Sequence, residues 1–215
     1  MPIRKDSRDL TDREWERLIC AMKEVKEDTS EDGWDEWENF HETYGEHGAT
    51  NNLYLAWHRG YLHQFEIRLQ EADNRVALPY WNWSERGRIP KELRRRSWMG
   101  ITRRIVKVAT RHKRATNKIL EATNFVDMNA LSWDIHARIH GWVGGDMKSA
   151  SSSANDPIFF LHHAQIDRLW MLWQEQNTNI GFELPNVNMN NNLPGFIGLT
   201  ANDVIRSENI DVTYE

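Results

Sequence analysis

Nine histidines are present in the chain, and their spacing is the feature with the clearest chemical meaning. His136 and His140 are four residues apart, so on a helix both imidazoles would project from one face and could bind a single metal ion. His162 and His163 follow the apolar run 158–161, so one of the two should face the core and supply a third nitrogen. A lone histidine on an apolar face is more often a core residue than a ligand, but this convergence favours a metal site.

A second group of histidines lies earlier in the chain. His58 stands in the mostly apolar stretch 55–61, and His47 and His41 precede it. The sequence therefore indicates two groups of three histidines on the helices of one core. Two sites of equal composition suggest a pair of redox metals that share a small bridging molecule.

The ligand type narrows the choice of metal. All-imidazole ligand sets suit zinc, copper, iron or nickel, and the general affinity order favours copper where it is available. A zinc peptidase needs the glutamate base of His-Glu-x-x-His, whereas this chain reads His136-Ala-Arg-Ile-His140, so hydrolytic zinc chemistry is disfavoured. Cys20 is the single cysteine, which excludes an internal disulfide and a cysteine-based metal cage.

Length and composition point to one globular domain. The chain has 215 residues, 40% of them hydrophobic and 27% charged, which is near the average for a protein that folds in water. A net charge of −5 gives no general reason to bind nucleic acid or an anionic membrane. No apolar run approaches the roughly 20 residues of a spanning helix. Residues 1–10 lack the apolar core of a secretory signal, which predicts a cytoplasmic protein unless a leader was removed from a precursor.

Helical periodicity accounts for the segments that carry the first group of histidines. Thr11 and Glu14 form a capping-box pattern, and apolar residues follow at helical spacing as far as Val25. Within and just beyond the acidic stretch 27–38, aromatic residues recur every three or four positions from Trp34 to Tyr44, which predicts a second, shorter helix. Residues 53–72 have the clearest helical pattern in the chain, and they include His58.

The second half of the chain alternates helices with irregular segments. Residues 76–83 are aromatic and interrupted by Pro79, so we expect an extended segment packed in the core. Residues 130–142 and 158–174 are predicted helices, and the small residues of 144–153 predict a flexible loop between them. The Asn-rich, Gly- and Pro-containing stretch 177–198 predicts irregular coil.

A basic region covers residues 86–118 and includes Arg103, with helix expected at 117–120 at most. It could bind nucleic acid, but acidic helices flank it and few aromatic residues are interleaved. A solvated or counter-charged face is therefore favoured over a nucleic-acid interface.

Four motifs carry a resemblance to a known family. Residues 56–66 (AWHRGYLHQFE) resemble the copper-A signature of tyrosinases and catechol oxidases, and 79–83 (PYWNW) look like the segment that follows it. Residues 136–145 (HARIHGWVGG) and 155–170 (NDPIFFLHHAQIDRLW) resemble the copper-B signature. The chain is identified as a compact, single-domain, bacterial-type member of this family.

The resemblance implies a mainly α-helical protein in which a four-helix bundle core holds a dinuclear copper centre. It further implies two copper ions that bind O2 as peroxide, and one catalytic domain over residues 1–215 without a C-terminal shielding domain. In this family pattern the copper ligands fall on six histidines: His41, His47 and His58 for copper A, and His136, His140 and His163 for copper B. His162, His63 and His112 are then structural.

The family pattern also assigns roles to residues near the metals. Phe159 matches the aromatic residue that packs on a copper ligand, and Ala137 stands where many efficient monophenolases have an asparagine that orients a water. Asp127 is the candidate for the acid that would work with such a water to take the proton of the phenol. Many relatives have a cysteine bonded to the second copper-A ligand, but Gly45 precedes His47 here, so the thioether should be absent.

A charged trio is expected to support the ligands from behind. Asp167, with Arg59 and Arg168, resembles a buried network of charged groups that orients the imidazoles. The alternative is an ordinary salt bridge on the helix.

By this resemblance the chain is a tyrosinase-type oxidase that uses O2 to hydroxylate monophenols and to oxidise o-diphenols to o-quinones. Two alternatives stay open: a catechol or o-aminophenol oxidase without efficient monophenolase activity, and a hemocyanin-like protein that binds oxygen reversibly. The expected partners are O2 and a small phenol, with a copper-delivery protein as a further candidate, and neither nucleic acid nor a membrane.

Overall fold

The computed structural model describes residues 3–85, 87–94, 100–105, 112–178, 180 and 183–215, and its regular elements are helical. The α-helices are, in chain order, α1 (Asp12–Glu27), α2 (Trp34–Tyr44), α3 (Tyr54–Ala72), α4 (His112–Leu120), α5 (Phe125–Val143), α6 (Ile158–Gln176) and α7 (Ala201–Val204). Four 3-10 turns accompany them: η1 (Lys91–Leu93), η2 (Gly145–Lys148), η3 (Ser153–Asn155) and η4 (Ser207–Ile210). β-structure in the described residues is limited to three isolated bridges, so the mainly helical prediction is confirmed.

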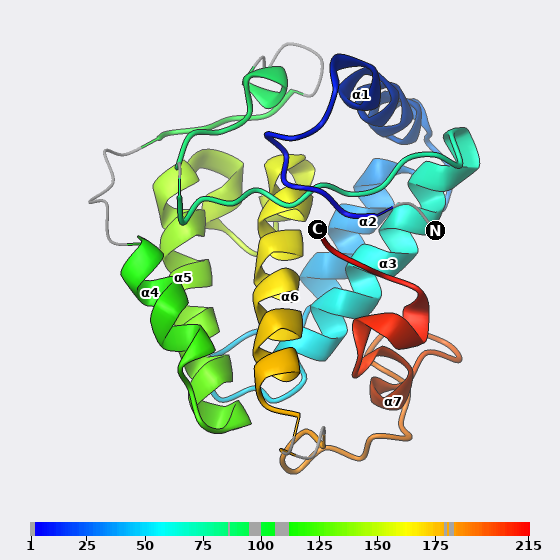
Figure 1. Ribbon diagram of the computed structural model, residues 1–215. Helices are drawn as coiled ribbons and strands as arrows, with labels where there is room; N and C mark the ends of the chain where they lie inside the picture. The colour runs from blue at the N-terminus through cyan, green and yellow to red at the C-terminus, as the bar shows by residue number, and fades with distance from the viewer. Residues whose placement is uncertain (1–2, 86, 95–99, 106–111, 179, 181–182) are drawn as a thin grey trace.

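The long helix α6 runs through the middle of the molecule, with α4 and α5 on one side and α2 and α3 on the other (Figure 1). Helix α1 lies across one end of this arrangement (Figure 1). The two chain ends lie side by side, because the Arg4 backbone N–H donates to the Thr213 carbonyl and the Glu215 N–H donates to the Arg4 carbonyl. None of the helices that the structure describes is long and apolar enough to cross a bilayer.

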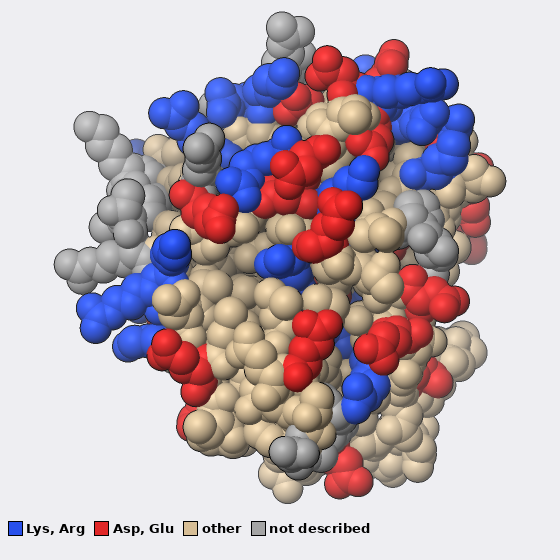
Figure 2. Space-filling model, in the orientation of Figure 1, with Lys and Arg blue, Asp and Glu red and all other residues tan. Residues whose placement is uncertain are grey.

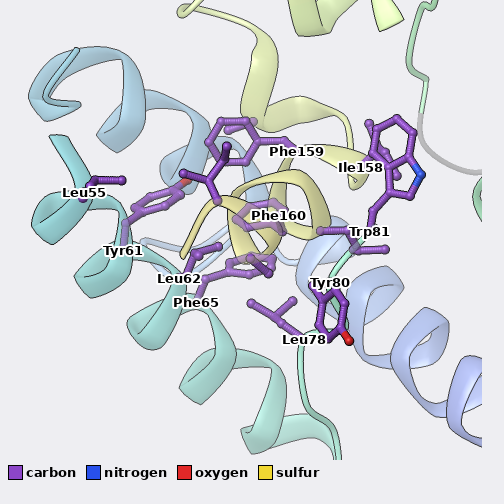
Figure 3. Packing of buried hydrophobic residues seen from close by; sticks show 14 of the residues in the cluster. Leu55, Tyr61, Leu62, Phe65, Leu78, Tyr80, Trp81, Ile158, Phe159 and Phe160 are labelled. Carbon is purple, nitrogen blue, oxygen red and sulfur yellow. The ribbon is translucent and has the colours of Figure 1, made fainter. Parts of the chain in front are cut away.

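Aromatic side chains fill the space between α2, α3 and α6 (Figure 3). The rings of Phe65 and Phe160 stack at 3.7 Å between centroids, and the Trp34 ring meets both edge-on at 5.3 and 5.4 Å. Each such pair adds roughly 0.5–1.5 kcal/mol to the stabilisation from area burial alone. This packing fixes α3 against α6, and these two helices carry His58 and His163, one histidine of each group.

The predicted start of a helix is correct where the sequence analysis used a capping motif, and it is wrong for two helices where no cap was considered. Thr11 and Glu14 form the predicted capping box at the start of α1. Helix α5, predicted to begin at residue 130, instead begins at Phe125, because the Asn124 side chain accepts a hydrogen bond from the Asp127 backbone N–H and caps the helix there. Asp127 therefore lies in the first turn of α5. Helix α4 likewise extends beyond the predicted 117–120 and begins at His112.

The extended segment 76–83 is packed in the core, as predicted, and the structure shows that it contacts α6. Trp81 and Trp83 are buried, and the Trp81 backbone N–H donates to the Leu161 carbonyl at 2.9 Å. The Trp83 indole N–H donates to His162 Nδ1 at 3.0 Å. This segment thus reaches the histidine pair on α6 directly.

The stretch 144–153 is more structured than the predicted flexible loop. Gly144 and Gly145 both have φ near 61°, and a Cβ at Gly145 would lie 2.2 Å from the Thr102 carbonyl oxygen. The Asp146 side chain accepts a hydrogen bond from the Thr102 backbone N–H at 3.0 Å, and its carbonyl accepts one from the Ser152 hydroxyl at 2.8 Å. These contacts fix the chain between α5 and α6.

Part of the basic region is buried rather than presented to a partner. The Arg103 guanidinium, 7% exposed as a residue, binds both oxygens of Asp156 at 2.5 Å, directly before α6. Residues 86, 95–99 and 106–111 of this region lie outside the described part of the chain. On the face shown in Figure 2, basic and acidic side chains lie beside one another rather than in a field of one sign.

Candidate metal centre

Three histidines from α2, the following loop and α3 form the first cluster. His41, His47 and His58 each offer a ring nitrogen within 4.8 Å of the others. The Nε2 atoms of His41 and His47 are 3.1 Å apart. His41 and His58 are buried, whereas His47 is partly exposed. The structure therefore brings the first predicted group together, although its members come from three separate segments.

The second cluster combines α5 with α6. His163 Nε2 lies 3.3 Å from His136 Nε2 and 3.3 Å from His140 Nε2. His162 belongs to the same group by distance, since its ring nitrogen also falls within the 4.8 Å limit. The four-residue spacing on α5 thus places two imidazoles on one helix face, as predicted, and α6 supplies the rest.

The two clusters form one site. The rings of His58 and His163 stack at 4.4 Å between centroids with an interplanar angle of 6°, so one histidine of each cluster touches the other cluster. Phe159 packs on both sides of this junction, at 4.7 Å from the His41 ring and 4.2 Å from the His163 ring. Figure 3 shows Phe159 beside Phe160 above the aromatic core.

Backbone carbonyls determine which ring nitrogen is free on three histidines. Nδ1 of His58 faces the Tyr54 carbonyl at 2.8 Å, Nδ1 of His140 faces the Met147 carbonyl at 2.6 Å, and Nδ1 of His41 faces the Ala150 carbonyl at 3.1 Å. A carbonyl accepts hydrogen bonds, so each Nδ1 carries the proton and each Nε2 presents a lone pair. On His58 this nitrogen is buried and has no hydrogen-bond partner among the described residues, and on His41 and His140 it faces the Nε2 of another histidine at 3.1 and 3.3 Å. The donor set therefore fits bound metal ions.

A hydrogen bond from the Trp83 indole distinguishes His162 from its neighbour His163 on α6. Trp83 donates its N–H to His162 Nδ1, and an indole N–H cannot accept. Neutral His162 therefore holds its proton on Nε2 and has no lone pair to offer there. His163 makes no such bond, and its Nε2 meets the other imidazoles of the cluster.

Burial keeps the clustered imidazoles uncharged at neutral pH. Burial, with a smaller contribution from the neighbouring His47, lowers the pKa of His41 to about 3 and that of His140 to about 4. Burial also holds the pKa values of His58, His136 and His163 well below the usual range, with smaller contributions from neighbouring histidines. Neutral imidazole is the form that binds metals, so protons compete weakly for these ligands.

A hollow of about 440 Å³ opens onto both clusters. Small residues of α5, Ala137 and Gly141, form one wall, and residues 147–150 lie among those that form the other. Nothing lies within 4 Å of where a Cβ would stand at Gly141. A flat ring therefore has access to the histidines. The full lining is His41, His47, Trp133, His136, Ala137, His140, Gly141, Met147, Lys148, Ser149, Ala150 and Ser153.

A family model described as the common central domain of tyrosinase matches residues 31–123 and 92–176, which include both clusters. The chain belongs to the tyrosinase family. The tyrosinase of Streptomyces glaucescens is 28% identical over an alignment 239 positions long, which covers 85% of this chain and 86% of that protein. Family membership agrees with the resemblance of the sequence motifs.

Solved structures share the fold of this tyrosinase-family chain. A functional unit of octopus hemocyanin superimposes with a TM-score of 0.85 at 23% identity, covering 100% of this chain and 68% of the other. Polyphenol oxidase from Grenache grape (Vitis vinifera) gives a TM-score of 0.84 at 18% identity, covering 100% of this chain and 85% of that one. The family implies a type-3 copper centre, and the two histidine clusters fit it.

Of the three residues predicted to act beside the copper ions, two lie at the site and one does not. Ala137 lines the hollow, and Phe159 packs on the imidazoles as expected. Asp127 does not reach the site: it binds the Asn124 amide at 2.7 Å, more than two helical turns before His136, and lines a separate surface hollow. The expectation for Asp127 is wrong, because α5 is one continuous helix that carries residue 127 away from the metal end.

The predicted charged trio is also rearranged. Arg59 pairs with Asp167 at 2.5 Å in the core, but Arg168 instead donates to the Glu215 carbonyl and covers the Tyr80 ring. The further partners of Asp167 are Arg4, at 3.5 Å, and the Tyr214 hydroxyl, at 2.5 Å, so this carboxylate anchors the chain ends to α3 and α6. None of its hydrogen bonds in the described residues reaches an imidazole.

Several groups that shape the site were not anticipated. The Met147 and Ala150 carbonyls leave no signal in residue type, because any residue can supply a carbonyl. The role of Trp83 could have been predicted, since this residue ends the PYWNW motif, which follows the copper-A signature in the sequence. His63 and His112 lie outside both clusters, in agreement with their structural reading.

Proposed function

We propose that this protein is a dicopper phenol oxidase that uses O2 to oxidise o-diphenols to o-quinones and, more slowly, to hydroxylate monophenols. The observation that carries the proposal is the hollow that opens onto both clusters, which gives an aromatic ring access to the metals. His41, His47 and His58 would hold one copper, and His136, His140 and His163 the other. When bound, the copper pair would supply redox chemistry between the phenolic substrate and O2.

The protein's own part is to hold, orient and shield. Backbone carbonyls fix the imidazoles of His41, His58 and His140, and Phe159 covers the ring of His163 from the core side. Neutral ligands add no charge to the site, so either oxidation state is tolerated. The wall of Ala137 and Gly141 lets the ring approach edge-first, with its hydroxyl groups toward the clusters.

The missing proton acceptor supports a bias toward diphenols. A free phenol has a pKa near 10, so its hydroxylation needs a group that takes the proton. No carboxylate belongs to the described residues that line the hollow, and Ala137 cannot orient a water. Catechol oxidation depends less on such a group, because the ring only gives up two electrons and two protons and no C–O bond is formed.

The test is oxygen uptake by copper-loaded protein with 4-methylcatechol and 4-methylphenol side by side. We expect two coppers per chain, rapid uptake with the catechol and slower uptake with the phenol. As a control, Ala137→Phe should fill the hollow, keep both coppers and lose catechol oxidation. Reversible oxygen binding without turnover would instead assign the oxygen-carrying role that the hemocyanin relatives suggest, and one copper per chain would contradict the dinuclear site.

A further inference from the structure

The segment 147–150 forms part of the wall of the hollow and is fixed at both ends to the metal site. The Met147 carbonyl accepts from His140 of the second cluster, and the Ala150 carbonyl accepts from His41 of the first. Lys148 lies between these two anchors and lines the hollow. Its side chain therefore starts close to both clusters, on the wall opposite the small residues of α5.

Lys148 is the only permanently charged side chain among the described residues that line the hollow, and copper held by the histidines would add positive charge to it. The other titratable side chains among its described lining residues are histidines, which the proposed function assigns to the copper ions. Lys148 is exposed, and it takes part in none of the ion pairs found in the described residues. The nearest carboxylate in sequence, Asp146, is occupied by the Thr102 N–H and the Asn155 amide. The ammonium is therefore free to bind an anion that arrives with the substrate.

The opposite wall and the interior leave room for such a ligand. Gly141 presents no side chain, so a ring that passes between α5 and the segment 147–150 meets little resistance. Within the lining, the Ser153 hydroxyl is buried and has no hydrogen-bond partner among the residues that the structure describes. A buried hydroxyl without a partner indicates that a polar atom of a ligand or a water binds there. The hollow thus combines space for a flat ring beside Gly141, a buried hydroxyl at Ser153 and an exposed ammonium group at Lys148.

We propose that Lys148 selects phenols that carry a carboxylate on the side chain para to the reacting hydroxyl, that is, hydroxyaryl-alkanoic acids. The inference rests on the proposed function, because the hydroxyl end of the ring must point to the metals for the para substituent to point outward to Lys148. An ion pair formed there binds the anionic substrate and leaves the neutral one unaffected. Its contribution falls as salt screens the exposed ammonium.

The first experiment compares three catechols of different charge: 3,4-dihydroxyphenylacetate, neutral 4-methylcatechol and cationic dopamine. Copper-loaded parent protein should prefer the acid, and Lys148→Gln should lower kcat/KM for the acid by about threefold to tenfold, chiefly through KM. The value for 4-methylcatechol should stay unchanged. Lys148→Glu should lower kcat/KM for the acid further and should raise kcat/KM for dopamine. Arg138→Gln is the matched control, since Arg138 is a nearby exposed cation that pairs with Asp134 and does not line the hollow.

A binding measurement without turnover completes the test. Under argon, calorimetry with copper-loaded protein should show tighter binding of 4-hydroxyphenylacetate than of its neutral amide, and Lys148→Gln should remove the difference. Equal effects of Lys148→Gln on acid and amide, or an equal loss in Arg138→Gln, would overturn the role of Lys148. If the parent fails to oxidise 4-methylcatechol at all, the proposed function fails instead, and the two failures are thereby distinguished.

Discussion

At the scale of single residues, the position of one proton decides which imidazole can serve as a ligand. A carbonyl opposite Nδ1 leaves Nε2 free, as for His58, whereas an indole N–H opposite Nδ1 places the proton on Nε2, as for His162. Distance alone groups His162 with the second cluster. The hydrogen bond from Trp83 separates it from His163, because a protonated nitrogen has no lone pair for a metal.

The adjacent histidines give a matched pair of variants. His163→Ala should remove a ligand, lower the copper content by about one ion per chain and abolish catechol oxidation. His162→Ala should keep both coppers and lower the free energy of unfolding by roughly 1–3 kcal/mol, because the Trp83 N–H loses its buried acceptor. Elemental analysis measures the copper content of each variant, and urea unfolding measures its free energy of unfolding. Loss of copper in His162→Ala with retention in His163→Ala would reverse the assignment.

Ala137 permits a test of the proton acceptor. Ala137→Asn should raise kcat/KM for tyramine by up to about tenfold relative to dopamine, because an amide in the hollow can orient a water. The gain stays at the low end of general-base effects, since no carboxylate lines the described wall of the hollow to complete the pair. Ala137→Val controls for side-chain volume. A rise of equal size for both substrates would show that proton removal does not limit the monophenol reaction.

At the scale of elements, the chain that joins α5 to α6 acts as part of the metal site. Two of its carbonyls hold one histidine of each cluster, and it is held in turn by residues 102–104. Gly144 and Gly145 allow the tight approach, because both adopt the left-handed backbone region near φ 61°. The conformation of this segment therefore fixes the orientation of His140 and His41.

A single methyl group should disturb this segment. Gly145→Ala would place a Cβ 2.2 Å from the Thr102 carbonyl oxygen at a strained φ, which should cost on the order of 1–3 kcal/mol and weaken copper binding. Gly141→Ala is the control, because its Cβ meets nothing within 4 Å and alanine favours the helix. Thermal unfolding and copper titration of the two proteins measure the effect. Equal stability and copper affinity in both variants would contradict the role of the segment.

At the scale of the whole molecule, the fold keeps several imidazoles uncharged that would accept protons in the unfolded chain. The folded pKa of His41 is about 3 and that of His140 about 4, against about 6.5 when unfolded. Between these limits the unfolded chain binds more protons than the native protein. Stability is therefore fully present above about pH 6.5 and is lost as the pH falls toward the folded pKa values.

The metal-free protein should show this dependence clearly. From pH 7 to pH 5 its free energy of unfolding should fall by about 2 kcal/mol for each such buried histidine. Urea unfolding at intervals of half a pH unit measures the slope. His41→Phe should give a shallower slope, because one titrating group is gone. A stability that stays constant over this range, or an unchanged slope in the variant, would contradict the burial of neutral imidazoles.

Local periodicity and residue type determined much of this protein from the sequence alone. The helices at 34–44 and near 53–72, the buried extended segment at 76–83 and the four-residue spacing of His136 and His140 depend on contacts within a few residues, so they can be read from the chain. The signature motifs likewise carried the family, because long matches in a fixed order are specific.

The tertiary structure decided which distant groups meet. It placed Asp127 at the far end of α5, turned Arg168 away from Asp167, and brought the carbonyls of 147 and 150 to the imidazoles. Each of these outcomes depends on how separate helices and loops pack, and not on the types of neighbouring residues. Lys148 gains its place in the wall of the hollow in the same way, since a lysine in a serine-rich loop has no distinguishing mark until the loop is folded against the metal site.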